Sequence, residues 1–213
     1  HKSNQIVDTF DVTGDGRPDL VKSDDDPDRW IIYKNETNRF SDPNNRMEWP
    51  TWFGEIRDIH NDYEDGFPTK SAPMDFNRDG YIDILHANGD NELGVNLNTG
   101  NGFSGVRWYP LPADDLWIRK AQDPGDDPFD PDSPHVEQEF TDINGDSRPD
   151  IVRRKNDHQW QIWVNTGACD NDPNATNCFA SYGIWQVNHS DGFLEEVEDD
   201  NDVRVMMADM NGD

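Results

Sequence analysis

Short apolar stretches recur along this chain, and each of them directly follows an acidic loop. The first stretch after each loop begins with a pair of aliphatic residues: Leu20-Val21, Ile84-Leu85 and Ile151-Val152. A polar turn rich in Asp and Asn comes next, and a second stretch then alternates in character before it ends in an asparagine. Two such stretches joined by a short Asp/Asn/Gly turn are typical of a β-hairpin. The asparagines that end the three hairpins are Asn35, Asn98 and Asn165.

The hairpin is one part of a longer unit that repeats along the sequence. A phenylalanine follows each asparagine, and a tryptophan follows each phenylalanine. A further apolar stretch precedes each acidic loop, most clearly over 6–10, 136–140 and 203–207. Each unit therefore offers about four strands in roughly 65 residues, which is the period of a β-propeller blade. The aromatic residues in question are Phe40, Phe103, Phe179, Trp49, Trp108 and Trp185.

The pattern predicts an all-β fold with about three four-stranded antiparallel blades. The expected repeats span about 5–68, 69–135 and 136–202, and the start of a fourth lies at 203–213. Together they form one propeller-type domain over 1–213 that is incomplete, because three repeats and a fraction do not close a ring. We expect the chain to be a processed or partial piece of a longer protein. It opens at His1 without an initiator methionine or signal peptide, and it ends inside a repeat.

The acidic loops carry oxygen-bearing side chains at their first, third, fifth and ninth positions. In the third repeat the loop spans 142–150 and reads DINGDSRPD. This spacing allows a tight loop to turn its side chains inward around one hard cation, and calcium prefers six to eight oxygen ligands. The EF-hand loop has similar early spacing but reaches a glutamate at its twelfth position. Here the last acid is the ninth residue, and it leads into a strand.

The loop occurs three times in full, at 11–19, 75–83 and 142–150, and begins a fourth time at 209–213. The first acids of the four copies lie 64, 67 and 67 residues apart. A periodic series with the same apolar flanks favours about three calcium sites and a partial fourth over the alternative of solvated acidic turns. Without metal, the carboxylates gathered in each loop repel one another. We therefore expect the metal-free protein to be loosened or unfolded.

Composition and charge restrict the partners of this protein. Hydrophobic residues make up 32% of the 213 residues, yet there are eight Trp and ten Phe, which a disordered acidic chain would lack. The formal net charge is −27, and three calcium ions would bring it to about −21 (−27 + 6). Such a charge disfavours nucleic acid and anionic membranes as partners. No apolar run approaches the roughly 20 residues of a membrane span, so we expect no membrane insertion.

Two cysteines, Cys169 and Cys178, flank a polar stretch rich in turn-forming residues. A disulfide that closes this short loop is the favoured interpretation, and it implies an oxidising compartment. The alternative is a pair of free thiols in a cytosolic loop. Three N-x-[ST] sequences, which begin at Asn35, Asn174 and Asn188, are glycosylation candidates and also point to an extracellular protein. We expect a secreted or cell-surface location.

The loops and the segments that follow them resemble FG-GAP/VCBS repeats, which form integrin-α-like β-propellers that are usually seven-bladed. The resemblance rests on the loop pattern D-x-[DN]-x-D-G-x-x-D and on the segments LNTGNGF (97–103) and VNTG (164–167), and it covers nearly the whole chain. It implies side-chain calcium ligands at positions one, three, five and nine, and a backbone carbonyl ligand at position seven. The implied ligands are Asp11, Thr13, Asp15, Arg17 and Asp19; Asp75, Asn77, Asp79, Tyr81 and Asp83; Asp142, Asn144, Asp146, Arg148 and Asp150; and Asp209, Asn211 and Asp213 of the partial loop.

Two positions depart from the family pattern. Thr13 replaces the usual Asp or Asn at the third position, which predicts a weaker first site. Ser147 replaces the glycine that eases the turn, and Gly145 just before it is expected to compensate.

Nothing in the sequence indicates an enzyme. The histidines form no zinc-binding motif, the cysteines form no C-x-x-C, and no G-x-S-x-G or P-loop is present. Trp49, Trp108 and Trp185 are expected to pack in the core instead of forming sugar-stacking platforms. We expect Trp117, Trp52 and Tyr109, which lie in variable segments, to be more exposed.

Three functional hypotheses remain, and calcium is structural in all of them. The leading one is an extracellular recognition or adhesion module that binds a protein or glycan through its blade loops. The second is a structural glycoprotein subunit whose blades stack on copies of itself in an extracellular assembly or filament. The third is a segment of the propeller shell of an Rhs or toxin-complex-like protein, which the NTGNGF phrase (98–103) also resembles.

Overall fold

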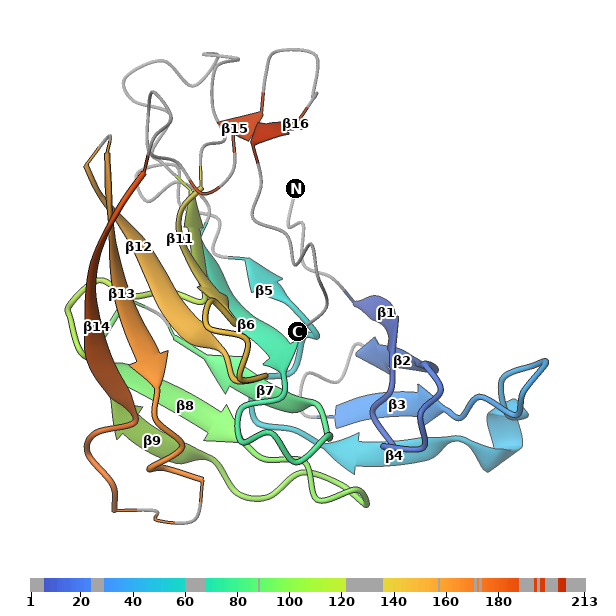
Figure 1. Cartoon of the computed structure of the whole chain (residues 1–213). Helices are drawn as coiled ribbons and strands as arrows, with labels where there is room; N and C mark the ends of the chain where they lie inside the picture. Colours follow the sequence, from blue (N-terminus) through green and yellow to red (C-terminus); the bar gives the residue numbers. More distant parts are fainter. Residues whose placement is uncertain are drawn as a thin grey trace.

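The regular secondary structure that this computed structural model describes is almost entirely β-strand (Figure 1). Among the residues that the structure describes, one short 3-10 helix, Pro43–Asn45, interrupts the strands. The all-β fold class predicted from the sequence is therefore confirmed. The structure describes residues 6–23, 29–59, 68–87, 89–121, 136–156, 158–170, 172, 174–187, 194, 196–197 and 203–205.

Three meanders of four antiparallel strands each, which we call blades 1, 2 and 3, make up most of the fold. Blade 1 contains β1 (Val7–Phe10), β2 (Asp19–Ser23), β3 (Arg29–Tyr33) and β4 (Met47–Pro50). Blade 2 contains β6 (Thr69–Met74), β7 (Asp83–His86), β8 (Glu92–Asn96) and β9 (Arg107–Pro110). Blade 3 contains β11 (Val136–Thr141), β12 (Asp150–Asn156), β13 (Gln159–Asn165) and β14 (Phe179–Gln186).

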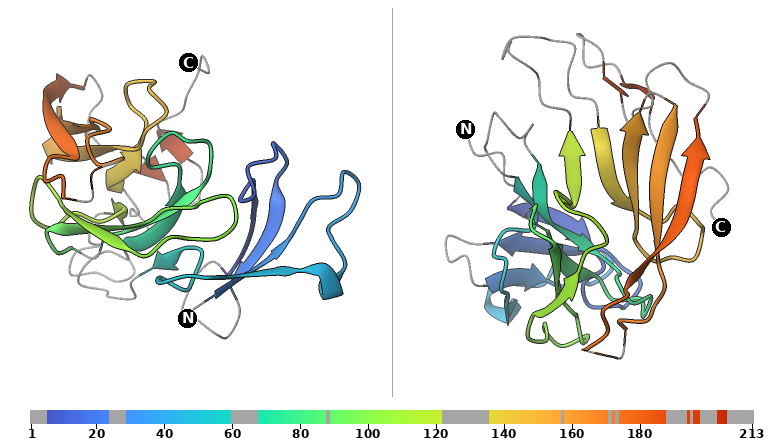
Figure 2. Two further views of the ribbon diagram at one scale, coloured as in Figure 1. Left: turned by 90° about the horizontal axis from the view of Figure 1, so that it is seen from below. Right: turned by 90° about the vertical axis from the view of Figure 1, so that its left-hand side faces the viewer.

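Blades 2 and 3 are joined into one curled sheet, whereas blade 1 is a separate sheet beside it (Figure 2). The link is β10 (Arg119–Ala121), which pairs with both β6 and β11. A further short strand, β5 (Asp58–Ile59), also pairs with β6. The sequence pattern does not predict β5 or β10, because both lie in the variable segments between repeats. The last pair is β15 (Glu196–Val197) with β16 (Val203–Val205).

Strand pairing aligns the three blades residue by residue. The asparagine that ends each hairpin lies opposite the phenylalanine that follows it: Asn35 faces Phe40, Asn98 faces Phe103, and Asn165 faces Phe179. Five residues before each asparagine, the third strand carries Trp30, Leu93 and Trp160. The fourth strand places Trp49, Tyr109 and Trp185 opposite these three.

This alignment shows that Trp108 is one residue out of register with Trp49 and Trp185. Because successive side chains of a strand point to opposite faces, a shift of one residue places Trp108 on the other face of its sheet. The prediction that all three tryptophans pack in the core is correct for Trp49, but wrong for Trp108 and Trp185, which are 49% and 37% exposed.

The three residues that the sequence predicts to be more exposed, Trp52, Trp117 and Tyr109, differ in their exposure. Trp52 is 71% exposed, as the sequence predicts. Trp117 and Tyr109 are buried, which contradicts the prediction. Tyr109 is buried because it occupies the register position of Trp49, on the face of blade 2 that packs against blade 3.

Aromatic side chains connect each blade to the one before it. Phe103 of blade 2 contacts Trp30 and Trp49 of blade 1 edge to face, with ring centroids 5.2 and 5.7 Å apart. Phe179 of blade 3 approaches Phe76 of blade 2 in the same manner, at 6.5 Å. Edge-to-face pairs at these separations add to the free energy of burying their apolar area. The core of this fold therefore lies between the blades.

His86 at the end of β7 is largely buried in the contact between blade 2 and the segment that follows blade 1. Its ring stacks on Phe53 with centroids 4.4 Å apart, and its Nδ1 lies 2.7 Å from the hydroxyl of Ser71. Burial, with a smaller contribution from the charge of Lys70, lowers the pKa of His86 from 6.5 to about 4. The folded protein therefore holds this imidazole neutral under mildly acidic conditions.

The low pKa of His86 predicts a loss of stability on mild acidification. Between about pH 6.5 and about pH 4 the unfolded state binds a proton that the folded state does not. The free energy of unfolding therefore decreases as the pH is lowered through this range. Full titration through this range lowers the free energy of unfolding by on the order of 3 kcal/mol. Urea unfolding at about pH 7.5 and about pH 5 should show a smaller decrease for His86→Gln than for the wild type. Equal decreases in the two proteins would contradict this assignment.

Candidate functional site

The three acidic loops occupy the same place in their blades, between the first and second strands. Residues 11–18 connect β1 to β2, residues 75–82 connect β6 to β7, and residues 142–149 connect β11 to β12. In each loop the fourth and sixth residues adopt a left-handed backbone conformation, which favours glycine. Their φ angles are 70° at Gly14 and 81° at Gly16, 62° at Arg78 and 85° at Gly80, and 80° at Gly145 and 67° at Ser147.

Ser147 therefore takes the left-handed conformation itself. Gly145 occupies the other left-handed position of the same loop, as Gly14 does in blade 1. The expectation that Gly145 compensates for the missing glycine is wrong, because the two residues fill different positions of one turn.

The first aspartate of each loop forms hydrogen bonds with the backbone of the same loop. Its carboxylate accepts N–H groups from the fifth and sixth residues, which closes the turn around it. Asp11 accepts from Asp15 (3.0 Å) and Gly16 (2.6 Å), Asp75 accepts from Asp79 (3.2 Å) and Gly80 (2.9 Å), and Asp142 accepts from Asp146 (3.1 Å) and Ser147 (2.6 Å).

The ninth aspartate is fully buried in all three loops, at Asp19, Asp83 and Asp150. One of its oxygens accepts an N–H from the start of the loop, and the other accepts the N–H of the asparagine that ends the hairpin. The loop donors are Thr13 (3.2 Å), Phe76 (2.9 Å) and Ile143 (3.3 Å). The hairpin donors are Asn35 (2.9 Å), Asn98 (2.7 Å) and Asn165 (2.7 Å).

The fifth residue also accepts a backbone N–H, that of the seventh residue, so the loop interior is lined by oxygens. Asp15 accepts from Arg17 at 3.1 Å, Asp79 from Tyr81 at 2.9 Å, and Asp146 from Arg148 at 2.9 Å. At the third position, the amide oxygens of Asn77 and Asn144 accept the N–H of the fifth residue at 3.1 and 2.8 Å.

Burial makes the carboxylates of Asp75, Asp83 and Asp150 costly to ionise in the absence of a cation. Desolvation raises the pKa of Asp83 to about 8 and that of Asp150 to about 6, and the neighbouring carboxylates of each loop add to the effect. Burial also raises the pKa of Asp75. In blade 1, hydrogen bonds from Arg17 and Lys34 lower the pKa of Asp15 to about 2. Basic side chains thus offset part of the negative charge of the first loop.

The donor set of the loops fits a calcium ion. Each loop gathers side-chain oxygens of which at least three are carboxylates, the chemistry that calcium prefers. Thr13 Oγ1, at the third position of the first loop, is buried and has no hydrogen-bond partner in the described part of the chain. A bound cation would give this buried oxygen, which stands at a ligand position, the partner that it lacks.

Among the described residues, no group of three or more His, Cys, Asp and Glu side chains stands in an arrangement ready to hold a metal. The carboxylate oxygens are instead engaged by backbone N–H groups.

The hairpin asparagines connect consecutive blades, a role that the sequence analysis does not assign to them. The side-chain amide of Asn98 donates to the carbonyl of Val12 in the loop of blade 1 at 2.8 Å, and the amide of Asn165 donates to the carbonyl of Phe76 in the loop of blade 2 at 3.2 Å. Both asparagines are 2% exposed. Their constant distance from the ninth aspartate, 15 residues in blades 2 and 3, is the sequence signal for this role.

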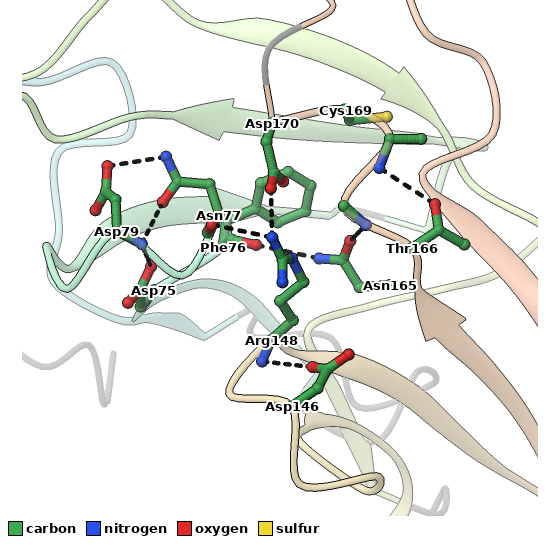
Figure 3. Close-up of polar contacts among 12 residues, drawn as sticks. Asp75, Phe76, Asn77, Asp79, Asp146, Arg148, Asn165, Thr166, Cys169 and Asp170 are labelled. Atoms are coloured by element: carbon green, nitrogen blue, oxygen red, sulfur yellow. Dashed lines mark hydrogen bonds and ion pairs between the residues drawn. The ribbon is translucent and has the colours of Figure 1, made fainter.

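The seventh loop residue reaches the preceding blade with its side chain. Arg148 of blade 3 donates to the carbonyl of Asn77 in the loop of blade 2 at 3.3 Å and forms an ion pair with Asp170 (Figure 3). In blade 2 the ring of Tyr81 lies against Gly14 in the loop of blade 1, where a Cβ would meet the ring at 2.2 Å. The backbone carbonyl role implied for the seventh position remains a prediction.

The predicted disulfide between Cys169 and Cys178 is present, with an S–S distance of 1.91 Å. It closes the loop that holds Asp170, and both cysteines are buried in the apolar layer between blades 2 and 3. Of the glycosylation candidates, Asn174 is exposed in this loop, while Asn35 lies at the end of the blade 1 hairpin and donates to the carbonyl of Pro18. Asn188 and the partial fourth loop, Asp209, Asn211 and Asp213, lie outside the described residues.

Comparisons with known proteins support the fold. No protein-family model matches the sequence, and no curated protein sequence matches it. Among solved structures, the chain is similar to part of a Photorhabdus luminescens Tc holotoxin pore, with a TM-score of 0.53 and 13% sequence identity. The similarity covers 89% of this chain and 7% of the other. At this identity it shows a shared fold, which fits a propeller-like β architecture. No helix among the described residues is long and apolar enough to cross a membrane.

Substitution of Gly14 tests the contact between the loop of blade 1 and Tyr81. Gly14→Ala and Gly16→Ala place alanine at similar φ angles, 70° and 81°, but only the first places a methyl group against the Tyr81 ring. We expect Gly16→Ala to lower the free energy of unfolding by about 1 kcal/mol through backbone strain. Gly14→Ala should lower it by a further 1–3 kcal/mol, roughly, through the clash. Urea unfolding in calcium measures both, and equal losses would show that the contact contributes nothing.

Proposed function

We propose that this chain is a calcium-stabilised scaffold segment of a larger β-propeller. In this proposal each bound ion rigidifies a loop that holds two consecutive blades together. The observation that carries the proposal is the double role of Asn98. Its N–H binds the buried carboxylate of Asp83 in its own loop, and its side chain binds the carbonyl of Val12 in the loop of the preceding blade. Asn165 repeats the arrangement one blade later.

Calcium would be held by side chains at the first, third, fifth and ninth loop positions. When bound, it supplies two positive charges that neutralise carboxylates otherwise gathered close together in one loop. In blade 2 these are Asp75, Asp79 and Asp83, and burial raises the pKa of Asp75 and Asp83. A loop neutralised in this way keeps the buried aspartate ionised and able to accept both N–H groups. The proposal gives calcium a structural role and assigns no catalytic step to the chain.

The loop pattern and its position before the second strand support membership of the FG-GAP/VCBS repeat family. In this proposal the protein is extracellular, since the Cys169–Cys178 disulfide requires an oxidising compartment to form and persist. The similarity to a segment of a Tc holotoxin favours one form of the scaffold role, that of a shell segment in a toxin-complex-like assembly.

A second candidate function is recognition of a protein or glycan by the segments between blades. Trp52 favours it, because a tryptophan that is 71% exposed on a loop offers a flat ring for stacking. Binding to glycans that is abolished by Trp52→Ala and kept in Trp108→Ala would support this function.

Calcium titration tests the scaffold proposal. Isothermal titration calorimetry of metal-free wild type should show about three calcium ions bound. Chelation with EDTA should lower the free energy of unfolding by several kcal/mol, roughly RT ln(1 + [Ca]/Kd) per site. Absence of calcium binding at about millimolar concentration, the weak end of known protein sites, together with unchanged stability in EDTA, would contradict the proposal.

Single loop variants test which residues bind the ion. Asp79→Asn and Asp146→Asn each remove one carboxylate at a fifth position but keep an oxygen for the N–H of Tyr81 or Arg148. Each should weaken one of the three sites at least tenfold, roughly, because affinity follows the number of charged ligands. The matched control is Asp114→Asn, which removes an exposed carboxylate outside the loops and should leave all three sites intact.

A further inference from the structure

The buried aspartates of the three loops are connected to one another by a continuous series of hydrogen bonds, which we call the relay. Each step passes from the ninth aspartate of a loop to the asparagine that ends its hairpin. The side chain of that asparagine then reaches into the loop of the preceding blade. The residues of the relay, in order from blade 3 to blade 1, are Asp150, Asn165, Phe76, Asp83, Asn98, Val12, Thr13 and Asp19.

The first half of the relay joins the loop of blade 3 to the loop of blade 2. Asp150 accepts the N–H of Asn165 at 2.7 Å, and the side-chain amide of Asn165 donates to the carbonyl of Phe76 at 3.2 Å (Figure 3). The N–H of Phe76 donates in turn to Asp83, the buried aspartate of its own loop, at 2.9 Å. Phe76 lies between the first and third ligand positions of this loop. Its backbone is therefore held by the buried aspartates of two loops at once.

The second half of the relay joins the loop of blade 2 to the loop of blade 1. The other oxygen of Asp83 accepts the N–H of Asn98 at 2.7 Å, and the side-chain amide of Asn98 donates to the carbonyl of Val12 at 2.8 Å. This carbonyl belongs to the same peptide group as the N–H of Thr13, which donates to Asp19 at 3.2 Å. A peptide group that accepts at its oxygen and donates at its nitrogen is polarised by both bonds, so each bond strengthens the other.

Burial makes the relay sensitive to the loss of any one of its bonds. The aspartates of the relay, together with Asn98 and Asn165, are at most 2% exposed. A buried donor or acceptor that loses its partner has no water to replace it, and this is unfavourable. A loop that moves its ninth aspartate out of place leaves the N–H of its hairpin asparagine unpaired, and the contact of that asparagine with the preceding loop is weakened as well. The relay therefore favours states in which neighbouring loops are ordered together.

From the relay we propose that the calcium sites of neighbouring blades are coupled, so that occupancy of one loop raises the calcium affinity of the next. The inference rests on the scaffold function proposed above and states how its sites act together. An occupied loop holds its ninth aspartate in place and, through the hairpin asparagine, the second residue of the preceding loop. The preceding loop then loses less conformational entropy when it binds its own ion. Because such coupling is reciprocal, each of two neighbouring sites raises the affinity of the other by the same factor.

A calcium titration of the 213-residue chain, followed at single amides by nuclear magnetic resonance, tests the coupling. The N–H groups of Gly16, Gly80 and Ser147 each donate to the first aspartate of their own loop, so they report on the three loops separately. Asp146→Asn weakens the site of blade 3 and should also lower the apparent affinity read at Gly80 by about threefold. This is the shift expected for two similar sites with a coupling factor of about tenfold. Asp79→Asn should lower the affinity read at Ser147 by about the same factor.

The variant that breaks the relay is Asn165→Ala, which removes the amide that reaches the loop of blade 2 and leaves every loop ligand in place. In this background the effect of Asp146→Asn on the affinity read at Gly80 should fall from about threefold to at most about 1.5-fold. The remaining effect is assigned to Arg148, which also donates to a carbonyl in the loop of blade 2, at 3.3 Å. The change of charge in Asp146→Asn is the same in both backgrounds, so the comparison isolates the relay.

The matched control is Asn35→Ala, which removes the corresponding asparagine of blade 1, whose amide donates to a carbonyl of its own blade. In this background the effect of the blade 3 variant should stay at about threefold. Near-ultraviolet circular dichroism in calcium checks the fold of each variant. If Asn165→Ala is unfolded, Asn98→Ala replaces it, because it breaks the second half of the relay; Asp79→Asn is then read at Gly16.

Two results would overturn the inference. One is an affinity at Gly80 that Asp146→Asn leaves unchanged, and the other is an effect as large in the Asn165→Ala background as without it. Calcium binding at three independent loops would refute the coupling alone. A titration to about millimolar calcium that shifts none of the three reporter amides would refute the scaffold function itself, and the coupling with it.

Discussion

The arrangement of the blades depends on one buried carboxylate in each loop, that of Asp19, Asp83 or Asp150. A buried carboxylate is stable when its oxygens are hydrogen-bonded and its charge is balanced. Two backbone N–H groups satisfy the first requirement, one from the loop and one from the end of the hairpin. Calcium would satisfy the second. The single aspartate therefore fixes the position of the hairpin asparagine, whose side chain in turn reaches the preceding blade.

This coupling explains how a chain with few hydrophobic residues can hold its blades in a fixed arrangement. The apolar layers between blades are clusters of buried side chains, across which Phe103 and Phe179 make edge-to-face contacts. Apolar packing is not directional, whereas the bonds of Asn98 and Asn165 to loop carbonyls have defined geometry. The polar contacts at the loop end of each interface set the register of the blades, and the aromatic contacts supply the burial.

Much of this architecture could be predicted from the sequence, because strand periodicity and loop chemistry are local properties. The recurring loops, the hairpins and the disulfide required only spacing and residue type. The contacts between blades could not be predicted, since they join residues such as Val12 and Asn98 that are 86 positions apart. The face on which Trp108 lies could not be predicted either. Trp108 shares a place in the sequence pattern with Trp49, but a one-residue difference in register puts it on the other face of the sheet. The contacts of the Arg148 and Tyr81 side chains with the preceding blade could not be predicted, because the loop pattern implies a role only for the backbone at this position.

Amide hydrogen exchange of Asn98 and Asn165, with calcium and after its removal, tests the central claim most directly. Their N–H groups bind the buried aspartates at 2.7 Å. If calcium holds these carboxylates in their ionised, hydrogen-bonded state, both amides should be strongly protected in calcium and lose that protection in EDTA, while amides in the middle of β13 lose less. Equal protection of Asn98 and Asn165 with and without calcium would show that the loops hold the blades together without the ion.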